Sequence, residues 1–154
     1  MGLDMYLTKR TYIGGNYDHR QIKGTIYITK AGEQIPISLD KESSITEEAM
    51  YWRKSNQIHK WFVDNVQGGV DNCEEYRVSV DQLKKLLKLC KQVDKDHSLA
   101  HELLPTQEGF FFGGTAYDEY YFEDIKATIK GLSQVVKNCH DEDWDITFLY
   151  QSSW

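Results

Sequence analysis

The stretch SVDQLKKLLKLCKQV, residues 79–93, predicts a helix that packs one apolar side against a core. Ser79 followed three residues later by Gln82 is a capping-box pattern, in which the two residues bond each other's backbone N–H groups at a helix start. The apolar residues then recur at spacings of three and four, which places them on one helical face: Leu83, Leu86, Leu87, Cys90 and Val93. This helix is predicted to be purely structural.

A second capping-box pattern lies upstream, in Ser44-Ile45-Thr46-Glu47. It predicts a helix over 45–66, which the glycine pair at 68–69 ends. At 100° per residue, the buried face of this helix should carry Tyr51, Ile58 and Phe62, and its exposed face should carry Arg53 and Lys60. A third helix is predicted downstream of Asp118, with a stripe made of Phe122, Ile125, Ile129, Leu132, Val135 and Val136.

The two ends of the chain show the period-2 pattern of strands. Leu3, Met5 and Leu7 alternate with polar residues near the start, as do Ile146, Phe148 and Tyr150 near the end. Between them, residues 25–29 and 35–38 are predicted to form a hairpin around a turn at 30–34, and Pro36 places the second arm at a sheet edge. The order favours an α+β fold, a single domain over 1–154, with a small, mostly antiparallel sheet packed against about three helices.

Composition excludes several classes of protein. The 154 residues are 40% hydrophobic and 27% charged, which suits one compact domain, and no apolar run is long enough to span a membrane. The formal charge of −6 disfavours direct binding to nucleic acid. Neither a signal peptide nor a paired cysteine framework is visible among the three cysteines, so we expect a cytoplasmic protein with free thiols.

The first candidate site lies along the predicted helix 45–66. Trp52, Asn56 and His59 share a face, with Arg53 and Lys60 just beyond it. An indole that stacks and two cations that donate charged hydrogen bonds could form a pocket wall for an anionic or aromatic ligand. The structural alternative is a half-buried tryptophan beside a hydrogen-bonded histidine, with the two cations simply solvated.

The second candidate is the glycine- and phenylalanine-rich segment that precedes the third helix. Gly113, Gly114 and Thr115 lead into a helix start, where free backbone N–H groups favour an anion, and Tyr117, Asp118 and Tyr121 follow. Asp118 could instead cap those donors itself. The three consecutive residues Phe110, Phe111 and Phe112 cannot all face one core in an extended chain, so at least one should be exposed or pack on another element.

No metal site, cofactor motif or catalytic constellation stands out. His97 and His101 lie four residues apart without the HExxH pattern, and Cys139-His140 lacks a second pair at zinc spacing, so we expect no bound zinc and no cofactor. An acid/base enzyme could use His59 with a carboxylate such as Asp118. Nothing in the sequence brings these two residues together.

Several long motifs resemble a family of small proteins encoded by bacteriophages and prophages. They are the start MGLDMYL (1–7), YWRK (51–54) with IHKWF (58–62), LPT (104–106) with GFFFGGT (109–115), and YDEYY (117–121). The resemblance covers nearly the whole chain and implies a phage accessory protein of the bacterial cytoplasm, a class that often counters host defence. It carries over no catalytic residue.

Two hypotheses follow. The first is a non-catalytic binding protein that inhibits a host defence protein or sequesters a nucleotide-like signal, with a surface joining the Trp52–Lys60 face to the Gly113–Tyr121 segment. A binding protein explains why the chain has aromatic and glycine-rich segments bordered by basic residues but no recognisable catalytic constellation. The second is a small enzyme acting on a nucleotide or phosphate ester, with His59 as the acid/base group. In either case the chain could associate with itself.

Overall fold

The computed structural model describes residues 2–14, 24–38, 43–137, 139 and 143–154, and it has the predicted α+β architecture. Four strands form an antiparallel sheet in the order β4-β1-β6-β5, with bounds β1 Asp4–Ile13, β4 Ser43–Arg53, β5 Tyr76–Val78 and β6 Ile146–Ser153. The predicted alternation is confirmed at the start of β1, where Leu3, Met5 and Leu7 are buried. In β6 Phe148 and Tyr150 are buried as predicted, but Leu149 between them is buried too and Ile146 is only partly buried. The sequence also indicates a polar connection over 17–23 and an acidic turn over 141–143, of which 17–23 and 141–142 lie outside the described residues.

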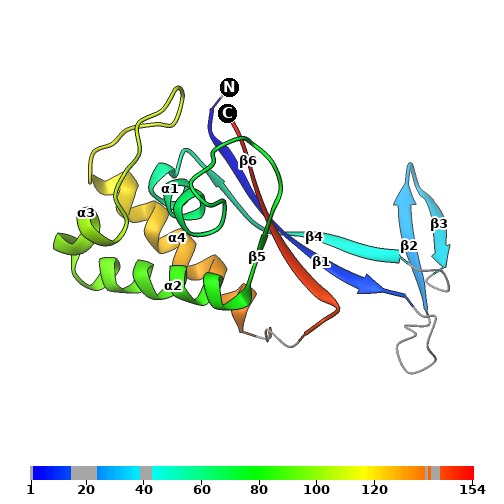
Figure 1. Ribbon diagram of the computed structural model, residues 1–154. Helices are drawn as coiled ribbons and strands as arrows, with labels where there is room; N and C mark the ends of the chain where they lie inside the picture. Colours follow the sequence, from blue (N-terminus) through cyan, green and yellow to red (C-terminus); the bar gives the residue numbers. More distant parts are fainter. Residues whose placement is uncertain (1, 15–23, 39–42, 138, 140–142) are drawn as a thin grey trace.

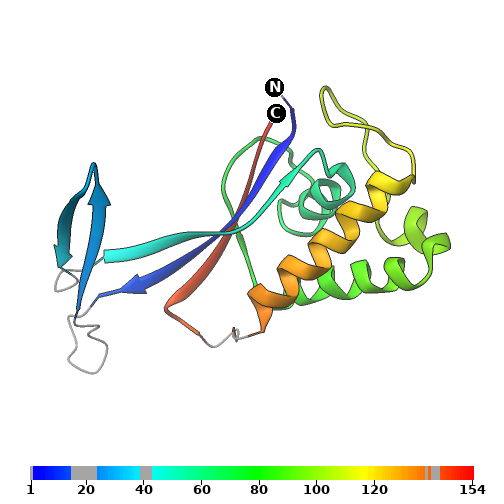
Figure 2. The ribbon, with the colours of Figure 1, turned by 180° about the vertical axis from the view of Figure 1, so that it is seen from behind.

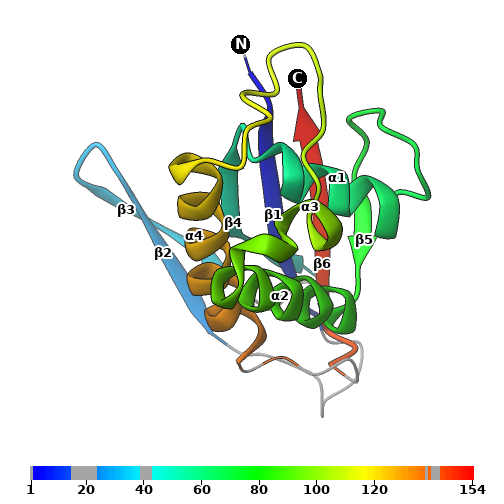
Figure 3. The same ribbon diagram turned by 90° about the vertical axis from the view of Figure 1, so that its left-hand side faces the viewer.

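Helices cover one face of this sheet (Figures 1 and 3). Their bounds are α1 Asn56–Asn65, α2 Val80–Lys95, the 3-10 turn η2 His97–Leu99, α3 Ala100–Leu103 and α4 Glu119–Val136. The capping box of α2 is confirmed: the Gln82 N–H donates to Ser79 Oγ at 3.0 Å and the Ser79 N–H donates to Gln82 Oε1 at 2.9 Å. All five apolar residues of its predicted stripe are buried. None of the described helices has the length and apolarity needed to cross a lipid bilayer.

The predicted helix over 45–66 is wrong in its first half. Residues up to Arg53 belong to β4, which pairs with β1 so that Trp52 lies opposite Met5 and Tyr51 opposite Tyr6. As a result Tyr51 is 42% exposed instead of buried, whereas Trp52 is buried in the core. The second half is correct: α1 follows directly, and Ile58 and Phe62 are fully buried. Arg53 is exposed as predicted, and Lys60 is half-exposed.

The hairpin predicted at 25–38 is confirmed and forms a separate two-stranded sheet. Its strands are β2 Thr25–Lys30 and β3 Glu33–Ser38, joined by a turn at Ala31 and Gly32. Figures 1 and 2 show that this hairpin lies at the far ends of β1 and β4, away from the helices. Both strands are exposed along their whole length.

Candidate functional site

The side chain of Asn56, the first residue of α1, connects the two predicted candidate segments. It is buried, and its Nδ2 donates to the carbonyls of Phe112 at 3.2 Å and Gly114 at 2.8 Å. Its Oδ1 accepts the backbone N–H of Gln107 at 3.0 Å. Three hydrogen bonds from one amide therefore hold both arms of the loop 105–118 against the junction of β4 and α1.

The backbone of the loop approaches this junction so closely that one position requires glycine. Gly113 has φ +93°, in the left-handed region that L side chains rarely adopt. A Cβ there would lie 3.1 Å from Lys54 Cβ and 3.2 Å from the Lys54 carbonyl oxygen. Lys54 itself has φ +59°, so both backbone segments bend sharply where they meet. No such requirement applies to Gly114, whose Cβ position is open.

A cleft of about 360 Å³ lies between this junction and the start of α4. Arg53 and Lys54 line it on one side, and Asp118 and Asp124 line it from α4. Burial raises the pKa of the Asp124 carboxyl, although hydrogen bonds from Ser55 and Gln57 oppose that shift. The cleft thus carries groups of both charges and would suit a ligand or partner side chain that is itself mixed in polarity.

Exposed aromatic side chains surround the loop. Phe110 is 81% exposed and Tyr120 is 77% exposed, while Phe112 is buried against the His59 ring. The prediction that the three phenylalanines cannot share one core is therefore confirmed. Phe111 is also exposed and adopts φ +67°, a conformation that is rare for a bulky residue and is held here by a hydrogen bond from the Leu3 N–H to its carbonyl.

The structure brings some of the predicted site residues together in this cleft and places others elsewhere. Those that line it are Arg53, Gly113, Gly114, Asp118 and Tyr121. Asp118 caps α4 by accepting the Tyr121 N–H at 3.1 Å, as the structural alternative predicted. Thr115 and Tyr117 lie on the adjoining turn, where both accept hydrogen bonds from Thr106.

Trp52, His59 and Lys60 do not line the cleft. The Trp52 Nε1–H donates to Thr128 Oγ1 at 2.9 Å, and its ring packs edge-on against Phe62, so it belongs to the core. Lys60 pairs with Asp64 at 2.8 Å along the outer side of α1. The interpretation of Trp52 as a stacking surface for a ligand is therefore wrong, because residues 45–53 form a strand whose Trp52 face points inward.

His59 lies in a buried hydrogen-bonded chain. Its Nε2 is 2.9 Å from Asp71 Oδ2 and its Nδ1 is 2.8 Å from Tyr150 Oη. A carboxylate only accepts hydrogen bonds, so Nε2 carries the proton and Nδ1 accepts from the Tyr150 hydroxyl. Burial raises the pKa of Tyr150 well above its usual value, which keeps that hydroxyl protonated. His59 is fully buried, so a ligand cannot reach its ring.

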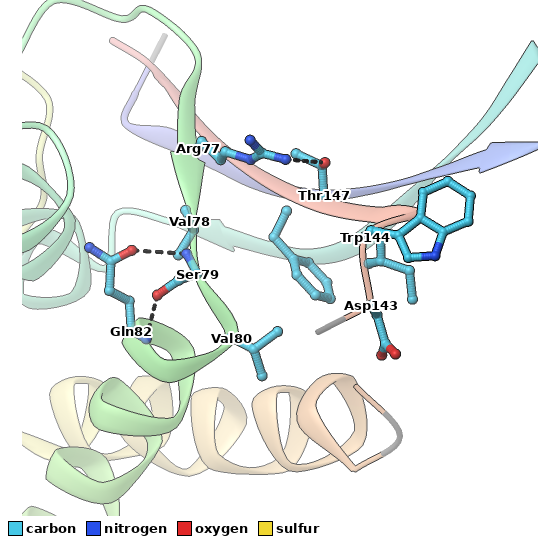
Figure 4. A pocket seen from close by; sticks show the side chains of 10 residues that line it. Arg77, Val78, Ser79, Val80, Gln82, Asp143, Trp144 and Thr147 are labelled. Atoms are coloured by element: carbon cyan, nitrogen blue, oxygen red, sulfur yellow. Dashed lines mark hydrogen bonds between the residues drawn. The ribbon is translucent and has the colours of Figure 1, made fainter. Parts of the chain in front are cut away.

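Another cavity, of about 430 Å³, lies between β5, the start of α2 and the start of β6 (Figure 4). Val78, Val80 and Phe148 are among its apolar lining residues, and Arg77 and Trp144 also line it (Figure 4). The α2 start is already occupied by its own capping box, and Arg77 donates to Thr147 Oγ1 at 3.0 Å. These polar groups are therefore bonded within the protein.

Several residues of the site could not be found from the sequence. Lys54 carries no signal of its positive φ, and Gln57 and Asp124 come together only through tertiary packing, at 3.5 Å. Asp71 and Tyr150 lie 12 and 91 residues from His59. Among the described residues, no group of three or more His, Cys, Asp or Glu side chains could hold a metal ion, and His140 lies outside them.

We expect Asn56→Ala to lower the free energy of unfolding by about 1–3 kcal/mol, because three backbone groups at this buried or partly buried junction lose their partner. Urea denaturation measures this loss. Asn65→Ala is the matched control, since this exposed residue on the same helix makes one hydrogen bond, to the Trp61 carbonyl, and should change stability by less than about 0.5 kcal/mol. Equal stability of the two variants would contradict the anchoring role of Asn56.

Comparison with known proteins gives no match. No protein-family model matches the chain. No curated protein and no solved structure matches it either. The resemblance of its motifs to phage and prophage proteins stays a prediction.

Proposed function

We propose that this chain is a non-catalytic binding protein that inhibits another protein through the loop 105–118 and the first turn of α4. The observation that carries the proposal is that the exposed Tyr120 lines a cleft that also contains Arg53, while Phe110 is exposed on the loop whose residues 113 and 114 line the same cleft. Large aromatic and arginine side chains dominate the binding energy of protein interfaces. Exposed side chains of these types close to a cleft therefore favour a recognition surface.

The loop is well suited to recognition because it is held in place before any partner arrives. Asn56 fixes its two arms, and the Tyr121 hydroxyl donates to the Leu104 carbonyl at 2.8 Å at its base. A preorganised loop loses little conformational entropy on binding, which strengthens affinity for a given set of contacts. The rare backbone conformation of Phe111 is a further feature that concentrates at binding sites.

The biological setting of the proposal comes from the resemblance to phage and prophage proteins. On that basis the chain would act in the cytoplasm of the bacterial host as a counter-defence factor, and its partner would be a host defence protein. The burial of His59 supports the non-catalytic form of the proposal, because an acid/base group must lie within hydrogen-bond reach of its substrate.

A second candidate function is sequestration of a nucleotide-like signal in the cleft. The volume of about 360 Å³ falls in the range of small-molecule sites, and Arg53 and Lys54 could bond phosphate oxygens while Tyr120 stacks on a base. Asp118 and Asp124 on the facing wall, together with the net charge of −6, oppose a polyanion. We therefore favour a protein partner.

We expect Phe110→Ala and Tyr120→Ala each to weaken binding of the partner by about 30-fold or more, while the melting temperature stays within a few degrees. A partner captured by the wild-type chain from bacterial lysate would be purified and its affinity measured by calorimetry. Val70→Ala is the control, because this side chain is 52% exposed but lies outside the loop.

Unchanged affinity in both aromatic variants would contradict the proposal. A panel of nucleotides titrated into the wild-type chain tests the second candidate. Tight nucleotide binding that Arg53→Ala removes would replace the protein partner with a small-molecule ligand. Arg53 suits this test because it is exposed and its 3.9 Å ion pair with Asp4 contributes little to stability.

A further inference from the structure

The hairpin of β2 and β3 has one face composed almost entirely of isoleucine. Ile26 pairs with Ile37 and Ile28 pairs with Ile35, so the four side chains project from the same face as two adjacent cross-strand pairs. They are 36–48% exposed. The opposite face is mostly polar and carries Thr25, Tyr27, Thr29, Gln34, Pro36 and Ser38.

This alternation is the pattern of a strand pair that buries one face. In the described part of the chain, however, β2 and β3 pair only with each other, and every residue of both strands is exposed. An isolated two-stranded hairpin is at best marginally stable in water unless its apolar face packs against something. The hairpin also extends away from the helical layer, so its isoleucine face is accessible to another molecule (Figure 1).

We propose that this isoleucine face is a dimerisation surface that packs against the same face of a second copy of the chain. Interfaces between identical chains are on average more apolar than those between different chains that associate transiently, whose composition resembles ordinary protein surface. The part of the face formed by the four isoleucines carries no polar group that would select a foreign partner. In a two-fold arrangement the same patch meets itself, as an isologous interface requires.

The charges at the tip of the hairpin fit the same arrangement. Lys30 pairs with Glu33 on the isoleucine side of the ladder, so the apolar stretch ends in one charge of each sign. The net charge at the tip is therefore zero, so it does not repel a second copy. Lys30 and Glu33 would form part of the polar rim of the interface. At the other edge, Pro36 lacks an N–H for a further ladder, which favours packing of faces over addition of strands.

The size of the surface sets the expected strength of the dimer. A stable interface buries about 800 Å² on each partner, which is more than four half-exposed isoleucines offer. The contact is therefore small, and we expect association in the micromolar range. This dimerisation is independent of the loop 105–118, because the hairpin and the loop lie at opposite ends of the sheet (Figures 1 and 2).

Sedimentation velocity of the full chain between about 1 and 100 µM tests the proposal. We expect the wild-type chain to shift from monomer to dimer over this range. Ile28→Lys should raise the dimer dissociation constant at least tenfold, because a charge then lies in the apolar interface. Thr29→Lys adds the same charge to the neighbouring residue on the opposite face and should leave the dimer intact.

A wild-type chain that stays monomeric throughout would overturn the proposal and leave the face to a foreign partner. It would also be overturned if Ile28→Lys and Thr29→Lys dimerise equally well. Ile35→Lys, on the other strand of the same face, repeats the test in case one variant misfolds locally. Near-ultraviolet circular dichroism of the buried Trp52 and Trp61 reports separately that the body of the protein remains folded.

Discussion

We expect Phe62→Ala to lower the free energy of unfolding by about 3–5 kcal/mol, a large part of the stability of a small domain. Phe62 is fully buried, and its ring stacks on Tyr150 with centroids 3.8 Å apart and planes 8° from parallel. Trp52 and Trp61 contact it edge-on at 5.8 Å and 5.2 Å. Removing the ring leaves a cavity where α1 meets the sheet, because the large rings around it cannot move in to fill the space.

Urea denaturation monitored by tryptophan fluorescence measures this loss. Phe110→Ala is the matched control, because it truncates the same side chain at a position that is 81% exposed, and it should change stability by less than about 0.5 kcal/mol. A Phe62→Ala variant as stable as Phe110→Ala would contradict the assignment of Phe62 to the core.

The helix α2 and the hairpin were predictable because their local signals agree with their environment. In α2 the capping box, the helical stripe and the burial of Leu83 and Leu86 all indicate the same element. In the hairpin, isoleucines at every second position flank a turn where Gly32 takes φ +85°. Periodicity predicts an element correctly where its tertiary contacts agree with its local sequence pattern.

Residues 45–53 show why the same reasoning failed nearby. Ser44 and Glu47 form a capping-box pattern, but both lie within the ladder between β1 and β4. Pairing with β1 satisfies this backbone, and β-branched Ile45 and Thr46 suit a strand. The helix begins instead after Ser55, whose side chain makes no cap hydrogen bond, so no local signal marks its start. Pairing with the distant strand β1, and not the local pattern, therefore determines the structure of residues 45–53.

The candidate site was predictable only as a meeting of two segments. Arg53 and the glycines 113 and 114 do line one cleft, as the hypothesis of a joined surface required. The sequence did not indicate that Asn56 would act as the anchor. Nor could it show that His59 faces inward, because its partners come from distant parts of the chain. Side-chain types identify candidates, whereas their direction depends on the tertiary fold.

We expect His59→Ala to lower the free energy of unfolding by about 3–4 kcal/mol, because the imidazole is a buried connector. Without it the Tyr150 hydroxyl and the Asp71 carboxylate each lose a hydrogen bond, while Asp71 keeps the one from Trp154 Nε1 at 3.0 Å. His101→Ala is the control, since this histidine is exposed on α3 and should be nearly neutral. A His59→Ala variant as stable as His101→Ala would contradict the structural role of this imidazole.

A double-mutant cycle with Tyr150→Phe separates the hydrogen bond from the packing of the imidazole. Tyr150→Phe alone leaves His59 Nδ1 without its donor, so it should cost about 1–3 kcal/mol. Once His59 is alanine, the Tyr150 hydroxyl no longer has this hydrogen bond to lose, so its removal should cost less than it does in the wild-type chain. We therefore expect the double variant to be more stable than the sum of the single losses predicts, by about 1 kcal/mol or more. Additive losses would show that the two side chains do not depend on each other, and that the chain from Asp71 to Tyr150 does not act as a unit.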